Sequence, residues 1–158
     1  MSAAKSHSKS VSRLEKHLGY WLRLVSNNVS AAFARKLEAQ GVSVSEWVAL
    51  RKLFDQPAAI SISALAEHMG MTKAPVSRLV DRLVQKELVY RQENRNDGRA
   101  QQIWLSPAGQ KLLPRLAAIA DENDEAFFGD LPMNGRLTMI GWMQNIAEKY
   151  RLSQAPVD

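Results

Sequence analysis

The stretch from residue 61 to residue 105 constrains the fold more than any other part of the chain, because its apolar pattern changes abruptly from helical to strand-like. A first short helical pattern begins at Ser61, which can cap a helix N-terminus, and ends at Gly70. A second begins after Thr72 and contains Pro75 in its first turn, where the missing N–H of proline does no harm. The sequence therefore predicts two short helices that meet at a tight, glycine-containing turn.

The second of these helices has two chemically distinct faces. Its apolar stripe, spaced at three and four residues, consists of Val76, Leu79, Val80 and Leu83. The opposite face is basic and rich in hydrogen-bonding groups, and it carries Lys73, Ser77, Arg78, Asp81, Arg82 and Gln85. The stripe predicts burial against the rest of the domain, which leaves the polar face directed outward.

After the second helix the alternation of residues is that of a β-hairpin. Residues 89–93 form one strand and residues 100–105 the other, across the segment 94–99. Asp97-Gly98 lies near the tip, and this dipeptide favours the tight turns of hairpins. A two-stranded hairpin is only marginally stable by itself, so we expect it to lean on the helices beside it.

The chain before residue 61 predicts two helices. The first, over residues 11–40, is long and amphipathic, and Gly41 is a suitable stop for it. Ser45 can cap the second helix, which continues to Phe54. The apolar face of the first helix consists of Leu14, Leu18, Trp21, Leu22, Val25, Val29, Ala32, Phe33 and Leu37.

The chain after residue 105 predicts two further helices. Ser106-Pro107 combines a cap with a proline at the first helical position, and it opens a long helix in which Pro114 can introduce a kink. Asn134 can cap a last helix. With 158 residues, the chain has the length of one ordinary compact domain.

Positive charge is concentrated in two blocks of the chain, whose net charge is +5. Residues 72–105, which include the basic helix face and the hairpin, carry seven Lys/Arg against four acidic residues. Residues 1–39 carry seven against two. A basic block that coincides with an exposed helix and a hairpin favours binding to a polyanion such as nucleic acid.

Several function classes find no support in the sequence. The chain has no cysteine, which excludes disulfides, thiolate metal sites and thiol redox switches. Its three histidines, His7, His17 and His68, lack metal-ligand spacing, and neither a phosphate-cradling glycine loop nor a nucleophile motif is present. We therefore expect neither an enzyme nor a cofactor. Residues 1–10 match neither a signal peptide nor a membrane anchor, so we expect a disordered tail on a cytoplasmic protein that does not enter a membrane.

Four segments, taken in this order and spacing, resemble the multiple antibiotic resistance regulator (MarR) family of bacterial transcription factors, over nearly the whole chain after Val11. They are Ser61-Ile62-Ser63-Ala64-Leu65-Ala66, then Met71-Thr72-Lys73-Ala74-Pro75-Val76-Ser77-Arg78-Leu79-Val80-Asp81-Arg82-Leu83, then Asp97-Gly98-Arg99-Ala100, and finally Leu105-Ser106-Pro107-Ala108-Gly109. The resemblance implies a mainly α (α+β) fold, a winged helix-turn-helix with a two-stranded β wing. It also implies a helical dimerisation region formed by residues 11–40 and 107–151, beside a DNA-binding region at residues 41–106.

The second helix of the motif has the chemistry needed to read the major groove. Arginine and lysine donate to guanine acceptors, and serine and threonine hydroxyls bond several bases. The predicted contacts on this helix are Thr72, Lys73, Ser77, Arg78 and Arg82. The alternative for each is an ordinary exposed polar residue, and Arg82 is placed to reach either a base or a phosphate. DNA would repel Asp81, so we interpret it as a partner for a neighbouring arginine.

The wing supplies a second set of candidates. In the family, the residue equivalent to Asp97 holds the arginine equivalent to Arg99 so that it enters the minor groove, where narrow grooves concentrate negative potential. Arg95 and Asn96 lie at the tip and are expected to touch phosphates or groove edges, whereas Arg91 at the base is a weaker candidate. A surface ion pair within the hairpin is the alternative for these residues. Family wings often carry another arginine at Gly98, so one contact is missing here.

Both ends of the chain hold more apolar residues than a small winged domain needs, and together they resemble the family's dimer layer. The interface candidates are Leu14, Leu18, Leu137, Ile140 and Ile146, with burial inside one chain as the alternative. Family members are commonly released from DNA by small aromatic or carboxylated effectors bound between this layer and the DNA lobes. His17, Trp21 and Trp47 are the candidate contacts for such an effector, against the alternatives of solvent exposure for His17 and of ordinary aromatic core for the tryptophans.

The function implied is that of a ligand-responsive repressor that binds palindromic, double-stranded operator DNA as a homodimer. A protein-interaction module that keeps the winged fold but has lost DNA binding is the alternative. The basic and polar outer face of residues 72–82 favours the first.

Overall fold

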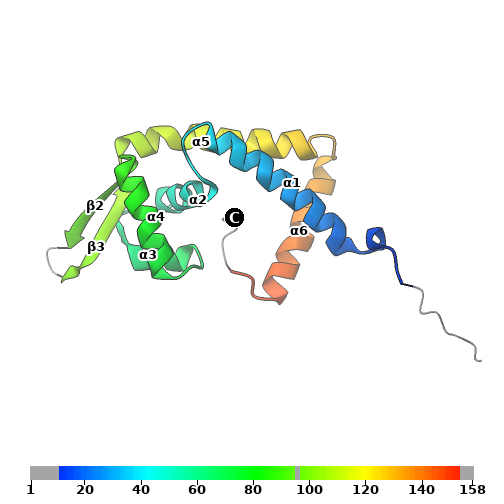
Figure 1. Cartoon of the computed structure of the whole chain (residues 1–158), viewed down its shortest axis with the longest axis horizontal. Coiled ribbons are helices and arrows are strands. Elements are labelled where there is room, and N and C mark those ends of the chain that lie inside the picture. The colour runs from blue at the N-terminus through cyan, green and yellow to red at the C-terminus, as the bar shows by residue number, and fades with distance from the viewer. Residues whose placement is uncertain (1–10, 95–96, 154–158) are drawn as a thin grey trace, which may run out of the picture.

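The computed structural model describes residues 11–94 and 97–153. Its elements follow one another as η1 (Leu14–Lys16), α1 (Leu18–Glu38), α2 (Val44–Phe54), β1 (Ile60–Ser61), α3 (Ile62–His68), α4 (Lys73–Gln85), β2 (Val89–Asn94), β3 (Asp97–Leu105), α5 (Pro107–Phe128) and α6 (Met133–Lys149). Figure 1 shows the strands β2 and β3 projecting from one end of the molecule and α6 at the other, with the long helix α5 running between them. The fold is mainly helical with a small antiparallel sheet, as the sequence predicts.

The hydrophobic core lies in the lobe that holds α2, α3, α4 and the sheet. Its fully buried side chains come from each of these elements and include Leu50, Leu65, Met69, Val76, Val80, Leu83, Val89 and Ile103. The end of α1 and the first half of α5 close this core through Leu37 and through Leu113 and Leu116. Helix α1 also packs along α5, where the side-chain amide of Asn123 donates to the carbonyl oxygen of Val29 at 3.2 Å. The base of the wing and the two long helices α1 and α5 therefore pack against the same hydrophobic core.

The sheet has three strands in the order β1-β3-β2, so the predicted two-stranded wing is joined on the β3 side by a third strand that was not predicted. Strand β1 pairs with β3 through Ile60 opposite Ile103. The two-residue strand was not predicted because it is too short to display an alternating pattern. The predicted hairpin itself is confirmed, with Val89 opposite Leu105 and an irregularity between residues 93 and 94.

The helix caps beside the DNA-binding motif follow the sequence closely. The hydroxyl of Ser61 accepts a hydrogen bond from the backbone N–H of Ala64, as expected of a cap. The hydroxyl of Ser106 accepts from the N–H of Gly109 at 3.0 Å and donates to the carbonyl oxygen of Glu87 at 2.6 Å. The latter bond ties the start of α5 to the turn before β2. Thr72 occupies the N-cap position of α4, although its side chain makes no capping hydrogen bond.

Three predicted helix starts are wrong. Ser43, not Ser45, caps α2, because Glu46 three residues later completes a capping box with it. Pro132 stands at the N-cap of α6, so Asn134 lies inside the first turn, where its side chain accepts from the N–H of Gly135. At the N-terminal end, residues 11–17 do not continue the long helix, which begins only at Leu18 after the short η1 turn.

The predicted stop of the first long helix is confirmed. Gly41 has a φ of +72°, a conformation that side chains with a Cβ rarely adopt, and it follows the end of α1. In the part of the chain that the structure describes, no helix combines the length and apolar character needed to cross a membrane.

Candidate DNA interface

Helix α4 sits in the molecule with its apolar stripe inward. The four residues predicted for that stripe, Val76, Leu79, Val80 and Leu83, are all buried. Helical spacing then turns the opposite face to solvent, where Thr72, Lys73 and Arg78 are exposed and Ser77 is half-buried. Four of the predicted base-reading residues are thus together on one open surface that begins at the N-terminus of the helix.

Arg82, the fifth predicted residue on α4, takes part in a different interaction. Its Nε lies 3.6 Å from a carboxylate oxygen of Glu46, which belongs to the first turn of α2. The Arg82 side chain is half exposed, so its guanidinium is accessible from outside the lobe. This contact places Arg82 at the border between the helix surface and the core, behind the open face that holds Arg78.

Glu46 is the centre of this cluster and is almost completely buried, with 1% of its surface exposed. The Nζ atom of Lys86 donates to both of its carboxylate oxygens, at 2.9 and 2.7 Å, and to the carbonyl oxygen of Gly41 at 2.8 Å. The backbone N–H of Ser43 donates a further bond at 2.9 Å. The carboxylate therefore joins the start of α2 to the end of α4.

The electrostatics of the cluster favour the ionised carboxylate. Burial by itself raises the pKa of Glu46, because a charge is costly away from water. The hydrogen bonds from Lys86 and from the Ser43 backbone, together with the positive charges of Lys86 and Arg82, outweigh burial and lower the pKa below its ordinary value. Glu46 was not among the predicted functional residues, although the spacing of Ser43 and Glu46 is the sequence signal of a capping box.

Asp81 has the role that the sequence suggests for it. Its carboxylate accepts a hydrogen bond from the Arg91 guanidinium, with 2.5 Å between Oδ1 and Nη1. Arg91 lies on β2, so the ion pair joins the helix that carries the basic face to the base of the wing. The interpretation of Asp81 as a partner for an arginine is confirmed, and Arg91 is engaged within the chain.

The tip of the wing lies outside the described residues. Arg95 and Asn96 fall there, so the structure places neither of them. The backbone of Asp97 and Arg99 belongs to β3, but the structure does not describe their side chains. The expected pairing of Asp97 with Arg99 therefore stays a prediction. The structure does describe the paired strands β2 and β3 on either side of this segment, and β2 contacts α4.

The residues predicted for an effector site do not come together within one chain. The ring of Trp47 packs edge-on against Phe33 of α1, with 6.4 Å between centroids, so it belongs to the periphery of the core. Trp21 lies twelve residues before Phe33 on the same helix, a rise of about 18 Å. The indole N–H of Trp21 donates to the carbonyl oxygen of Glu15, and the ring of His17 hydrogen-bonds the hydroxyl of Ser12.

The candidate interface residues at the two ends of the chain are exposed in the single chain. Their exposed fractions range from 49% to 78% for Ile146, Ile140, Leu137, Leu14 and Leu18. No residue of α6 is buried, although the helix carries many apolar side chains. Burial inside one chain, the alternative for these residues, is therefore wrong.

Two helices joined by a tight turn, an exposed basic second helix and an adjacent β wing define a winged helix-turn-helix DNA-binding protein. The model of the MarR family matches residues 42–100, which span α2 to the wing. The transcriptional regulator HosA of Escherichia coli O157:H7 is 31% identical over 94 residues, which are 60% of this chain and 69% of HosA. The chain belongs to the MarR family of transcriptional regulators, and it is a regulator rather than an enzyme.

Two solved structures have the same fold as this chain. MepR of Staphylococcus aureus, solved as a DNA complex, is similar over 84% of this chain and 98% of its own, with a TM-score of 0.74 and 22% identity. CouR of Rhodococcus jostii RHA1, solved with bound p-coumaroyl-CoA, is similar over 87% of this chain and 96% of its own, with a TM-score of 0.73 and 24% identity.

Proposed function

We propose that the chain is a ligand-responsive repressor that binds palindromic operator DNA as a homodimer in the cytoplasm. The observation that carries this proposal is the open face of α4, where Lys73 and Arg78 stand exposed over a buried apolar stripe. A helix held in this way has its donors free to meet base edges in a major groove. MepR, which shares the fold and was solved in complex with DNA, supports a DNA-binding function for this fold.

In the proposed complex the two reading elements have different tasks. Thr72, Lys73, Ser77 and Arg78 contact base edges and nearby phosphates in the major groove. The wing residues Arg95, Asn96, Asp97 and Arg99 act at the adjacent minor groove, where Asp97 orients Arg99 as the family resemblance implies. Arg82, held beside Glu46, faces the phosphate backbone rather than a base.

A second copy of the chain is the partner that the exposed apolar residues of η1, α1 and α6 require. A protein that remained monomeric would expose an unusually large apolar surface along these elements. A two-fold dimer covers the same patch on both copies and presents two α4 helices to a palindrome. We therefore propose residues 11–40 and 107–151 as the dimerisation region and residues 41–106 as the DNA-binding region.

The effector, a small aromatic or carboxylated molecule, is proposed to bind at the junction of the dimer layer and the DNA lobe. CouR, with its bound p-coumaroyl-CoA, supports a small-molecule effector on this fold. Trp21 and Trp47 lie too far apart to share a ligand within one chain. A site that uses both therefore takes one tryptophan from each of two copies. His17 lies one turn before Trp21 and would belong to the same side of the site. Binding there changes the separation of the two α4 helices, and the mismatch with the groove repeat weakens DNA binding.

Fluorescence anisotropy with a labelled duplex from upstream of the chain's own gene tests the proposal. We expect tight binding that weakens steeply as salt is raised, because phosphate contacts release counterions. A duplex with one half-site scrambled is the control and should bind much more weakly. Transcription in vitro from the same promoter should fall as the protein is added. Absence of binding to any duplex at low salt would instead support a protein-interaction module.

A further inference from the structure

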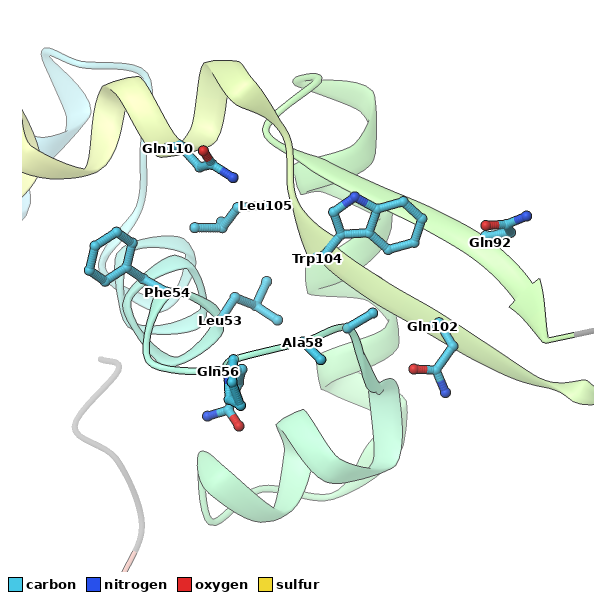
Figure 2. A pocket seen from close by; sticks show the side chains of 11 residues that line it. Leu53, Phe54, Gln56, Ala58, Gln92, Gln102, Trp104, Leu105 and Gln110 are labelled. Carbon is cyan, nitrogen blue, oxygen red and sulfur yellow. The ribbon is translucent and has the colours of Figure 1, made fainter.

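A pocket of about 660 Å³ opens on the side of the DNA-binding lobe, away from the surface of α4 described above. It lies between the end of α2, the segment 55–59, the outer face of the sheet and the first turn of α5 (Figure 2). None of His17, Trp21 and Trp47 lines it, so it is separate from the proposed effector junction. Its volume falls within the range typical of small-molecule sites, about 300–1,000 Å³.

Aromatic side chains form two sides of this pocket. In Figure 2, Phe54 and Trp104 stand on opposite sides of the opening, with Leu53 and Leu105 between them. The Trp104 ring contacts the ring of Tyr90, its cross-strand neighbour on β2, edge-on with 5.9 Å between centroids. Phe54 is 53% exposed at the end of α2, so its ring is accessible from the pocket. The pair offers flat apolar walls to a planar molecule.

Glutamine amides supply the polar groups of the pocket, and they come from four separate elements. They are Gln56 after α2, Gln92 on β2, Gln102 on β3 and Gln110 on α5. Gln56 donates its amide N–H to the carbonyl oxygen of Lys52 at 3.2 Å, which leaves its own side-chain oxygen as an acceptor. Each amide both donates and accepts, so the set can pair with a ligand that carries both kinds of group.

Among the side chains that the structure describes, those that line the pocket are all uncharged. The guanidinium of Arg51 lies 5.5 Å from the Phe54 centroid, but it is ion-paired with Asp55. A carboxylate that entered would lose water without gaining a cationic partner, which is costly. We infer that this pocket binds an uncharged, planar aromatic molecule with amide-like donors and acceptors, held between Phe54 and Trp104.

The position of the pocket gives such a ligand a route to the DNA-binding surface. Its lining residues belong both to the wing strands and to α2 and α5, which support the lobe. A ligand that contacts the wing strands together with α2 and α5 holds the wing at one angle to the rest of the lobe. By thermodynamic linkage, the ligand then changes the affinity for DNA, and DNA changes the affinity for the ligand by the same factor. This consequence rests on the proposed DNA-binding function, whereas the pocket and its ligand class do not.

A matched pair of probes, 2-naphthamide and 2-naphthoate, tests the inference on the full chain without DNA. The two differ mainly in charge, and the indole N–H of Trp104 reports binding in ¹H–¹⁵N spectra once Trp104→Phe has assigned it. We expect 2-naphthamide to shift the Trp104 signal and the side-chain amide signals of Gln102 and Gln110 saturably. We expect 2-naphthoate to leave them unchanged up to the same concentration. Equal binding of both probes, or shifts confined to Trp21 and Trp47, would overturn the inference.

Two variants and a control sharpen the test. Gln102→Glu places a charge in the pocket, and Gln110→Leu removes a hydrogen-bonding group; each should weaken 2-naphthamide binding at least fivefold while the spectra remain those of a folded protein. Gln40→Glu, a similar change outside the pocket, should leave the affinity unchanged. Unaltered affinity in both pocket variants would contradict the assignment. DNA titration of the same samples separates a failure of this site from a failure of DNA binding.

Discussion

The carboxylate of Glu46, in the first turn of α2, lies 2.7 Å from the ammonium group of Lys86, just beyond the end of α4. The two residues are forty positions apart in the sequence, and their contact fixes the end of the basic helix to the part of the lobe next to α1. Because Glu46 is buried while Lys86 remains partly exposed, the carboxylate is the member of the pair that depends on its partner.

Glu46→Gln should therefore destabilise the fold markedly. The change leaves Lys86 and Arg82 without their shared carboxylate and weakens the capping box of α2, and we expect a loss of about 2 kcal/mol in the free energy of unfolding. Urea denaturation measures this loss. Glu67→Gln, at an exposed position on α3, is the control and should stay within about 0.5 kcal/mol of the unchanged protein. Equal effects of the two changes would contradict the role of the cluster.

The same residue predicts a pH dependence with a definite sign. The pKa of Glu46 is lower in the folded chain than its ordinary value of about 4.3, so the unfolded chain binds more protons between the two pKa values. The stabilisation is complete above the unfolded pKa and is lost as the pH falls through the folded one. Urea midpoints of the unchanged protein and of Glu46→Gln should converge as the pH is lowered below about 5. Curves that stay parallel would show that Glu46 does not titrate in this way.

Gly109→Ala tests the close approach of α5 to the turn before the wing. A Cβ atom at this position would lie 2.2 Å from the carbonyl oxygen of Leu88, a backbone atom that also accepts the N–H of Ser106. We expect a loss of about 2–3 kcal/mol, because overpacking must displace the backbone. Gly19→Ala, where a Cβ meets nothing within 4 Å, should cost nothing measurable by thermal unfolding. A Gly109→Ala protein that melts with the unchanged one would be incompatible with this packing.

Arg78→Ala tests base reading by α4. Arg78 is exposed on the open face, so its removal should leave stability unchanged and weaken binding to the specific duplex by about 1–3 kcal/mol. Arg115→Ala removes another exposed arginine, from α5, and controls for net charge. Anisotropy titrations at fixed salt compare the two. If both variants lose affinity equally, the arginine acts through charge alone and not as a reader of base edges.

Leu137→Glu combined with Ile140→Glu tests the dimer. Both side chains are exposed on α6, and charges buried across a two-fold interface would oppose association. Light scattering after size-exclusion chromatography should show a monomer, and the affinity for the palindrome should fall at least tenfold. Phe54→Glu alters a comparably exposed apolar residue in the DNA-binding lobe and should leave the dimer intact. A double variant that remains dimeric would place the interface elsewhere.

Local signals allowed much of the fold to be predicted. Ser61 and Ser106 were identified as caps because each is followed by a helical pattern and, in the second case, by proline. All four residues of the apolar stripe of α4 were predicted correctly, because their spacing follows the helical period of 3.6 residues over the whole helix. Ser45 and Ser43 are both residues that can cap a helix, and the capping box with Glu46 is what makes Ser43 the start of α2. These outcomes depend on a few neighbouring residues.

What could not be predicted depends on contacts between distant residues. Strand β1 exists only because Ile60 pairs with Ile103, and two residues carry no period of their own. The Glu46 cluster combines residues of α2 and α4, and the glutamines of the pocket come from four separate segments. Neither site lies within one continuous stretch of sequence, so a local pattern predicts neither of them. Trp21 and Trp47 both lie near the expected junction in sequence order, but the length of α1 separates them.

The ion pair between Asp81 and Arg91 has a consequence for the DNA that this protein recognises. Val89 is buried beside α4 and Arg91 is bonded to Asp81, so the basic helix is joined directly to the base of the wing. In the proposed complex, this connection sets the separation between the bases contacted by α4 and the groove contacted by the wing. Operators should accordingly tolerate the exchange of single base pairs between these two points, but not the insertion or deletion of one.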